Sequence, residues 1–253
     1  MSTSMLSVRG LGMQFGGLKA LSDVTMEVAT GEFVGVIGPN GAGKTTFFHA
    51  ISGVHVPTSG TVRIRGQEMQ GNSPDAFCRA GVARTFQTPR IFGDMTVLEN
   101  VRFAFMFGNR GGDAALVDKV IEETHLSGLR GETAGELPPA RQRQLEIAMA
   151  LATAPRLLLL DEVAAGLTEG EVEDVARLIR RLRDTYGLTV VWIEHAVRTL
   201  MKTVDRVAVL NFGQLLADGT PAQIAADPKV ISAYLGDEVD DADKADKVDE
   251  VSQ

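Results

Sequence analysis

The sequence predicts an α/β protein in which a helical insertion interrupts the alternation of strands and helices. Three observations favour this fold class: a β-rich opening that leads into a glycine-rich strand-to-helix turn, a helical block from Thr96 to about Leu151, and a return to alternating strands and helices from Arg156. The chain has 253 residues, of which 44% are hydrophobic and 23% charged, as is usual for one large or two small globular domains.

Local hydrophobic patterns predict the individual elements. Before the insertion, short runs rich in apolar and β-branched residues alternate with glycine- and proline-containing turns, which is typical of strands. We expect strands at Met5–Arg9, Asp23–Val28, Phe33–Ile37, Thr61–Arg65 and Gly81–Phe86, and a helix at Thr46–Ser52.

The insertion and the second half follow the same reasoning. Helical periodicity predicts helices at Val97–Phe107, Ala114–His125 and Ala140–Leu151. Beyond the insertion we expect strands at Leu157–Asp161, Leu188–Ile193, Arg206–Leu210 and Gln214–Ala217, a helix at Glu169–Tyr186, and a short helix that begins near Pro221.

The glycine-rich turn has the pattern G-x-x-x-x-G-K-T and predicts a phosphate-binding loop. Glycines let the backbone curl so that N–H groups point at phosphate oxygens, and the following helix adds the positive end of its dipole. Lys44 is predicted to reach the β- and γ-phosphates, and the Thr45 hydroxyl to bind Mg²⁺. A turn without a ligand is the alternative, which the full motif between a strand and a helix disfavours. The loop comprises Gly38, Pro39, Asn40, Gly41, Ala42, Gly43, Lys44 and Thr45, and Thr46 follows it.

Acidic side chains end an apolar strand in the second half. Asp161 follows four leucines and is predicted to bind the metal, and Glu162 comes next, where its carboxylate can activate a water for attack. A core strand that runs into a surface acidic pair is the alternative. The phosphate-binding loop upstream favours the functional interpretation.

Two further side chains follow strands. His195 comes after Leu188–Ile193, and parallel strands bring their carboxyl ends to one edge of a sheet, so we expect His195 to contact the γ-phosphate or to hold the water and Glu162. Gln87 follows Gly81–Phe86, where a glutamine can touch both the metal and the water.

These motifs in this order, with a helical insertion between Gln87 and Asp161, resemble the nucleotide-binding subunit of an ABC transporter from Leu6 to about Leu235. The resemblance implies ATP as the nucleotide and a P-loop NTPase fold of the ABC ATPase type. That fold has a mixed sheet, an N-terminal antiparallel β subdomain and an inserted α-helical subdomain. The stretches V-A-R-T-F-Q, M-T-V-L-E-N, A-A-G-L and V-A-V-L-N-F-G resemble the ATPases of branched-chain amino-acid uptake systems.

The resemblance also implies roles for individual residues. Gly38 to Thr46 resembles the Walker A loop, Gln87 the Q-loop glutamine, Asp161 the Walker B aspartate, Glu162 the catalytic glutamate and His195 the switch histidine. Phe15 resembles the aromatic residue that stacks on adenine, and packing in the hydrophobic core is its alternative.

The chain departs from the family at the signature motif, where Leu-Ser-Gly-Gly-Gln or a close variant is usual. Pro138 and Pro139 have no N–H to donate, and the serine hydroxyl is absent. In this family the signature completes the partner subunit's ATP site, so we expect a heterodimer with one competent and one degenerate site. Val163 and Thr168 stand where proline and Asp or Asn are usual. The signature segment consists of Leu137, Pro138, Pro139, Ala140 and Arg141.

The resemblance further implies partners and a location. These are a second ATPase subunit, transmembrane permease subunits and, indirectly, a solute-binding protein, which place the chain peripherally on the cytoplasmic face of the inner or plasma membrane. The longest apolar runs are too short to span a bilayer, and no basic patch indicates nucleic-acid binding.

The chain is expected to form one ABC ATPase domain over residues 1–236, with a core of 1–95 and 153–236 and a helical insert of about 96–152. Residues 237–253 carry eight acids and two lysines, hence −6 of the chain's net charge of −8, and are expected to be a disordered tail. The alternatives for function are an ABC-fold regulatory protein with little or no hydrolysis, a P-loop phosphotransferase, and a two-cassette protein, which a single P-loop disfavours.

Overall fold

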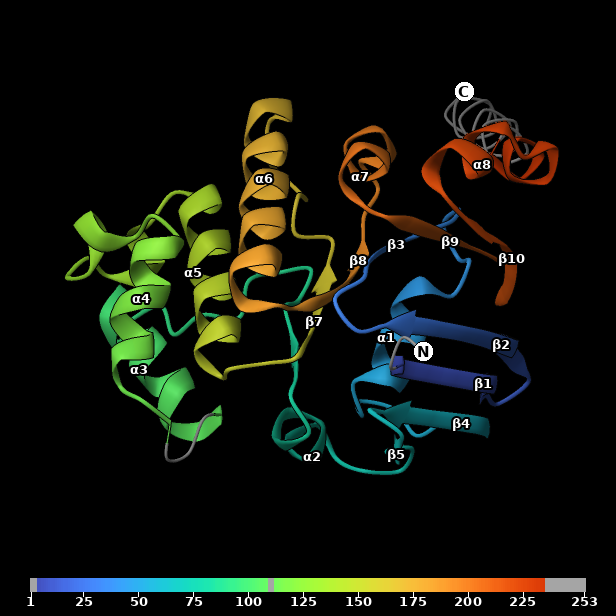
Figure 1. The fold of residues 1–253 in the computed structure, drawn as a ribbon, viewed down its shortest axis with the longest axis horizontal. Helices are drawn as coiled ribbons and strands as arrows, with labels where there is room; N and C mark the ends of the chain where they lie inside the picture. Colours follow the sequence, from blue (N-terminus) through green and yellow to red (C-terminus); the bar gives the residue numbers. More distant parts are fainter. Residues whose placement is uncertain (1–3, 109–111, 235–253) are drawn as a thin grey trace, which may run out of the picture.

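The computed structural model describes residues 4–108 and 112–234, so the expected acidic tail at 237–253 lies outside the described residues. One sheet has four antiparallel strands in the order β2-β1-β4-β5 (Figure 1). It confirms the expected N-terminal antiparallel subdomain, although β1 and β2 are both longer than predicted. The strands are β1 (Ser4–Phe15), β2 (Leu18–Ala29), β4 (Ser59–Ile64) and β5 (Gln67–Glu68).

The second sheet has the order β10-β9-β3-β8-β7-β6 and is parallel except for β10, which pairs antiparallel with β9. The expected mixed sheet is thereby confirmed. Strand β6 is shorter than the predicted Gly81–Phe86. The strands are β3 (Phe33–Ile37), β6 (Val82–Arg84), β7 (Leu157–Asp161), β8 (Thr189–Ile193), β9 (Arg206–Asn211) and β10 (Gln214–Gly219).

The central strands of this sheet are buried on both faces, which explains why they are apolar at almost every position. In β7, Leu158 and Leu160 belong to one hydrophobic cluster, whereas Leu157 and Leu159 belong to the other. The first cluster includes residues of the helical insertion, and the second includes residues of the antiparallel sheet. The six-stranded sheet therefore separates two cores.

The helical insertion lies between β6 and β7 in the chain and occupies one side of the molecule (Figure 1). It contains α3 (Val97–Gly108), α4 (Ala115–Glu123) and α5 (Pro139–Ala152), with 3₁₀ turns at Ser127–Leu129 and Ala134–Glu136. Helix α5 starts one residue before the predicted helix and ends one residue after it.

Helix α6 (Glu169–Tyr186) spans the residues that its pattern predicts, because both ends are encoded locally. The Thr168 hydroxyl accepts a hydrogen bond from the backbone N–H of Glu171, whose side chain accepts one from Thr168 in return, and Gly187 ends the helix in a left-handed conformation. Thr168, one of the departures from the family pattern, thus acts as the cap of this helix.

The remaining helices are short. The sequence patterns predicted α1 and α8, but not α2 or α7, because six or seven residues carry too few turns for a periodic signal. Among the described residues, no helix is both long and apolar enough to cross a lipid bilayer. These helices are α1 (Lys44–Ile51), α2 (Pro74–Arg79), α7 (Val197–Thr203) and α8 (Pro221–Ala226).

Candidate functional site

The phosphate-binding loop joins β3 to α1, as the sequence predicts, and two of its glycines leave no room for a side chain. A Cβ at Gly38 would lie 2.1 Å from the Leu210 carbonyl oxygen, and one at Gly43 would lie 2.7 Å from that of Ala20. Gly43 has a φ of 98°, which favours glycine, and directly precedes the first residue of α1. The neighbouring backbone therefore fixes the curl of the loop.

Lys44 is buried inside that curl. Its Nζ donates hydrogen bonds to the carbonyl oxygens of Gly38, at 2.7 Å, and Pro39, at 3.0 Å. Thr45, the next residue, is exposed on the first turn of α1. The ammonium group and a hydroxyl thus stand together at a helix N-terminus, which is the arrangement that binds phosphate.

Glu162, Gln87 and His195 meet in one cluster, although their positions in the chain lie far apart. Gln87 Nε2 donates to Glu162 Oε2 at 2.7 Å, and His195 Nε2 lies 2.9 Å from Glu162 Oε1. The structure therefore brings together the three residues that the sequence predicted as catalytic.

The backbone of Glu162 is held in an uncommon conformation. Its φ is 48°, in the left-handed region that non-glycine residues rarely adopt. The backbone N–H of Glu162 donates to the Ile193 carbonyl at 2.9 Å, which ties the end of β7 to the end of β8. Such strain is concentrated at functional sites, and here it aims a buried carboxylate at the edge of the sheet.

Asp161 is buried beside a partner that the sequence interpretation missed. Arg84, at the end of β6, places its guanidinium 2.5 Å from Asp161 Oδ2 and 3.1 Å from the Ser52 hydroxyl. Burial raises the pKa of Asp161, and the Arg84 charge opposes that effect. The sequence feature that could have indicated this pair is an arginine at the end of an apolar strand, because a buried arginine needs a counter-ion.

Glu194 is a second buried carboxylate that the sequence interpretation assigned no role. Its Oε1 accepts from the Ala164 N–H at 2.7 Å, and its Oε2 accepts from the N–H of His195 at 3.0 Å. Glu194 therefore links the loop that follows Glu162 to the segment that carries His195. Burial raises the pKa of the Glu194 carboxyl.

Replacing Glu194 with glutamine is expected to change how stability depends on pH. Because the pKa is raised in the folded state, the folded chain binds the Glu194 proton more tightly than the unfolded chain. The stabilisation is complete below the unfolded pKa of about 4.5 and is lost as pH rises through the folded pKa. The decline should be absent in Glu194→Gln, because the amide does not ionise. Urea unfolding of both proteins between pH 4.5 and 7.5 measures it, and parallel stability curves would refute the prediction.

Phe15 corrects one of the two interpretations that the sequence allowed. It is the last residue of β1 and is 45% exposed, so packing in the hydrophobic core is wrong. The ring meets the His55 ring edge-on, with 5.4 Å between centroids. Stacking of Phe15 on adenine stays a prediction.

The altered signature segment forms the start of α5. Pro138 is the residue before the helix and Pro139 is its first residue, so two positions at this helix N-terminus carry no N–H. The Arg141 guanidinium donates to Gln144 Oε1 at 2.7 Å and to the His125 carbonyl at 3.4 Å. The one cationic side chain of the segment is therefore engaged on its own subunit.

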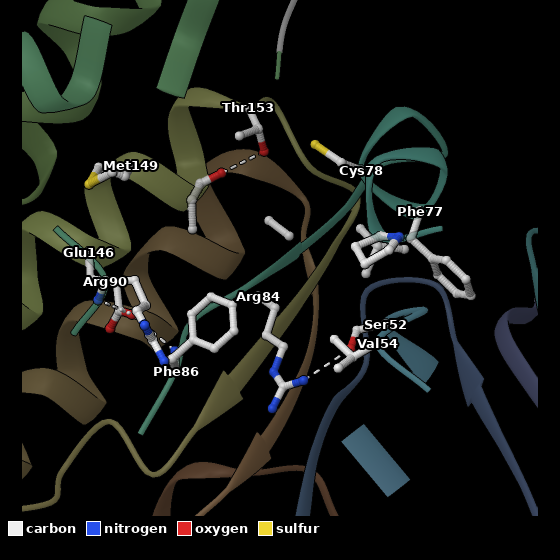
Figure 2. A pocket seen from close by; sticks show the side chains of 14 residues that line it. Ser52, Val54, Phe77, Cys78, Arg84, Phe86, Arg90, Glu146, Met149 and Thr153 are labelled. Atoms are coloured by element: carbon white, nitrogen blue, oxygen red, sulfur yellow. Dashed lines mark hydrogen bonds between the residues drawn. The ribbon is translucent and has the colours of Figure 1, made fainter. Parts of the chain in front are cut away.

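A pocket of about 280 Å³ lies beside this site (Figure 2). Figure 2 shows Phe86 and Arg84 reaching into it, with a hydrogen bond from Arg84 to Ser52. The Arg84 guanidinium lies 5.2 Å from the centre of the Phe86 ring. The pocket is lined by residues from the end of α1, from α2, β6 and the segment after it, and from α5: Ser52, Val54, Pro74, Phe77, Cys78, Val82, Ala83, Arg84, Phe86, Arg90, Glu146, Met149, Ala150 and Thr153.

Two family models match the sequence. Residues 21–165 match the ABC transporter family, and residues 214–240 match the branched-chain amino acid ATP-binding cassette transporter family. The first match covers more than half of the chain.

Curated proteins resemble the chain over nearly its whole length. It is 42% identical to the high-affinity branched-chain amino acid transport ATP-binding protein BraF of Pseudomonas aeruginosa. It is 41% identical to the LivG protein of Escherichia coli K12, which carries the same description. Each alignment covers 94% of this chain and all of the relative.

Solved structures of ATP-binding cassettes have a similar fold. The crystal structure of the ADP conformation of MJ1267, an ATP-binding cassette of an ABC transporter, superimposes with a TM-score of 0.84 at 30% identity. That alignment covers 92% of this chain and 99% of MJ1267.

Proposed function

This chain belongs to the ABC transporter family of ATP-binding cassettes, and on that premise we propose that it is the ATPase subunit of an importer for branched-chain amino acids. The observation that carries the proposal is the identity of 42% over the full length of BraF. The match of residues 214–240 to the branched-chain amino acid cassette family supports it.

The nucleotide site has the parts that ATP and Mg²⁺ require. Residues Gly38 to Thr46 would hold the phosphates, with Lys44 on the β- and γ-phosphates. Mg²⁺ prefers oxygen ligands, and Thr45, Gln87 and Asp161 supply a hydroxyl, an amide and a carboxylate. Gln87 Oε1 makes no hydrogen bond among the described residues, which suits a metal ligand. Bound Mg²⁺ would neutralise phosphate charge as the γ-phosphoryl group leaves.

Glu162 would orient the attacking water in line with the γ-phosphate and take a proton from that water. His195 and Gln87, each in contact with one carboxylate oxygen of Glu162, would keep that carboxylate in register. The exposed ring of Phe15 would stack on the adenine. The four groups come from different segments of the chain, so closure of the site depends on how those segments are held together.

The assembly would contain a second ATPase subunit, two permease subunits and a solute-binding protein that acts through them. The ATPase pair is proposed as a heterodimer, because Leu137–Arg141 would serve the partner's ATP site with fewer donors than usual. The chain would then sit on the cytoplasmic face of the membrane, attached through the permease. Within it, residues 1–95 and 153–236 would form the core, and about 96–152 the helical insert, of one domain.

We propose the pocket of Figure 2 as the permease contact, because it opens between the P-loop side and the helical insertion and its lining is mostly apolar. Its polar lining includes Arg84, which forms an ion pair with Asp161. An occupant of the pocket would therefore contact a residue that is bonded directly to the nucleotide site.

Reconstitution in proteoliposomes tests the proposal. ATP-dependent uptake of labelled leucine is expected when this chain is combined with the permease, the second ATPase and the binding protein. Val54→Arg, which places a charge in the pocket, should reduce uptake by at least about tenfold, whereas Val56→Arg should not. Val56 is a matched control, being exposed two residues away and outside the pocket. Uptake of other solutes but not of leucine, isoleucine or valine would refute the substrate class.

The altered signature favours a second candidate, a regulatory protein that uses the ABC fold to bind ATP with little hydrolysis. Stable ATP binding with no hydrolysis in any mixture of the subunits would support this candidate and contradict the transport proposal.

A further inference from the structure

We propose that Arg143 and Glu146 are positioning residues that hold the backbone after β6 so that the Gln87 side chain reaches Glu162. The proposal rests on the proposed function only in the identity of the pocket's occupant, since the hydrolytic site itself carries the argument. Arg143 and Glu146 lie one turn apart on α5 and are both buried, with 2.6 Å between Arg143 Nη1 and Glu146 Oε2.

Arg143 and Glu146 hold one short segment through hydrogen bonds to its backbone. Arg143 donates to the carbonyl oxygens of Phe86, at 2.6 Å, and Gln87, at 2.7 Å. Glu146 Oε1 accepts from the backbone N–H groups of Phe86, at 3.0 Å, and Arg90, at 3.1 Å. Four hydrogen bonds thus fix residues 86–90 to a helix of the insertion.

The segment that this pair holds also contacts the carboxylate of Glu162. Gln87, whose carbonyl Arg143 holds, places its side chain 2.7 Å from Glu162 Oε2. The path therefore runs from α5 through Arg143 to the Gln87 backbone, and from the Gln87 side chain to Glu162. Because α5 begins with the signature segment, movement of that segment would be passed to Glu162 along this path.

Glu146, one member of the pair, also lines the pocket. Glu146, Phe86 and Arg90 all line it, and the two N–H groups that Glu146 accepts belong to the other two residues (Figure 2). A permease segment seated in the pocket would press on the held backbone itself. The pair would thereby connect permease contact to the position of Gln87.

Stability alone is a weak reason for this pair. Replacing a buried ion pair by apolar residues is often neutral or stabilising, because desolvation of two charges offsets their attraction. Burial raises the pKa of Glu146, which shows that its desolvation is not fully compensated. The geometry points instead to a role in positioning the segment after β6. The Arg143 guanidinium donates to two consecutive carbonyl oxygens, and the Glu146 carboxylate accepts from two backbone N–H groups.

A double-mutant cycle with Gln87 tests the path. Single-turnover ATP hydrolysis is measured for the assembled complex that contains the wild-type chain, Arg143→Ala, Gln87→Ala or the double variant. If Arg143 acts through Gln87, Arg143→Ala should slow hydrolysis about tenfold when Gln87 is present. The same substitution should slow it less than about twofold in the Gln87→Ala background. Arg143→Lys, which keeps the charge but not the fork, should give an intermediate rate.

Two controls separate positioning from folding. The dissociation constant for ATP should change by less than about twofold, because the phosphate-binding loop lies outside the path. Arg206→Ala removes another guanidinium with several partners, which bonds Glu32 before β3 and Asp218 in β10, and should leave the rate unchanged. Equal slowing by Arg143→Ala in both Gln87 backgrounds would overturn the proposal. Absence of leucine uptake in proteoliposomes would count against the proposed function alone.

Discussion

Glu162→Gln is expected to lower ATP hydrolysis by about 10²–10⁴-fold while ATP binding is retained. Glu162 is the one carboxylate of the site that both Gln87 and His195 contact, and glutamine cannot accept the proton of the attacking water. The amide is isosteric, so the backbone at φ 48° and the fold should persist. Binding should persist as well, because Lys44 and the phosphate-binding loop are untouched.

The measurement is steady-state hydrolysis by the assembled complex, with ATP affinity determined separately. Glu169→Gln is the matched control: it makes the same change at an exposed position in the first turn of α6 and should hydrolyse ATP at the wild-type rate. A Glu162→Gln complex that retains more than about a tenth of the activity would remove Glu162 from the role of general base.

In the assembled complex, rebuilding the signature segment is expected to raise hydrolysis at the second subunit's ATP site by about 10²-fold. The changes are Pro138→Ser, Pro139→Gly, Ala140→Gly and Arg141→Gln. They return a hydroxyl and two N–H groups to the N-terminus of α5, where they would face a γ-phosphate bound to the second subunit. Removing one such donor from an enzyme typically costs about 10²–10³ in rate, which sets the size of the expected gain.

The experiment compares the rebuilt chain, the wild type and Ala140→Gly, which removes the Ala140 methyl group but restores neither the hydroxyl nor an N–H lost to proline. Only the rebuilt chain should gain activity, at a cost of about 1 kcal/mol in unfolding free energy from the added glycines. An equal gain in Ala140→Gly would show that the methyl group limits turnover. No gain in either variant would show that this segment does not limit turnover.

The sequence alone determined the fold class, the phosphate-binding loop and the cluster that follows β7 and β8. Each of these is encoded locally. The loop is recognised from its own glycine and lysine pattern between a strand and a helix, and the apolar runs of β7 and β8 identify central strands of a covered sheet. Because parallel strands end at one edge, the residues that follow them could be placed together before any contact was known.

Only the tertiary structure decided which side chains pair. Arg84 and Asp161 lie 77 positions apart, and Glu146 lies 60 positions from the Phe86 N–H that it accepts. No local pattern specifies such partners, because a buried charge needs some counter-ion but its own sequence does not name it. The exposure of Phe15 and the helices α2 and α7 also became visible only in the structure, because six or seven residues are too few for a periodic signal and the pattern around Phe15 allowed both a buried and an exposed ring.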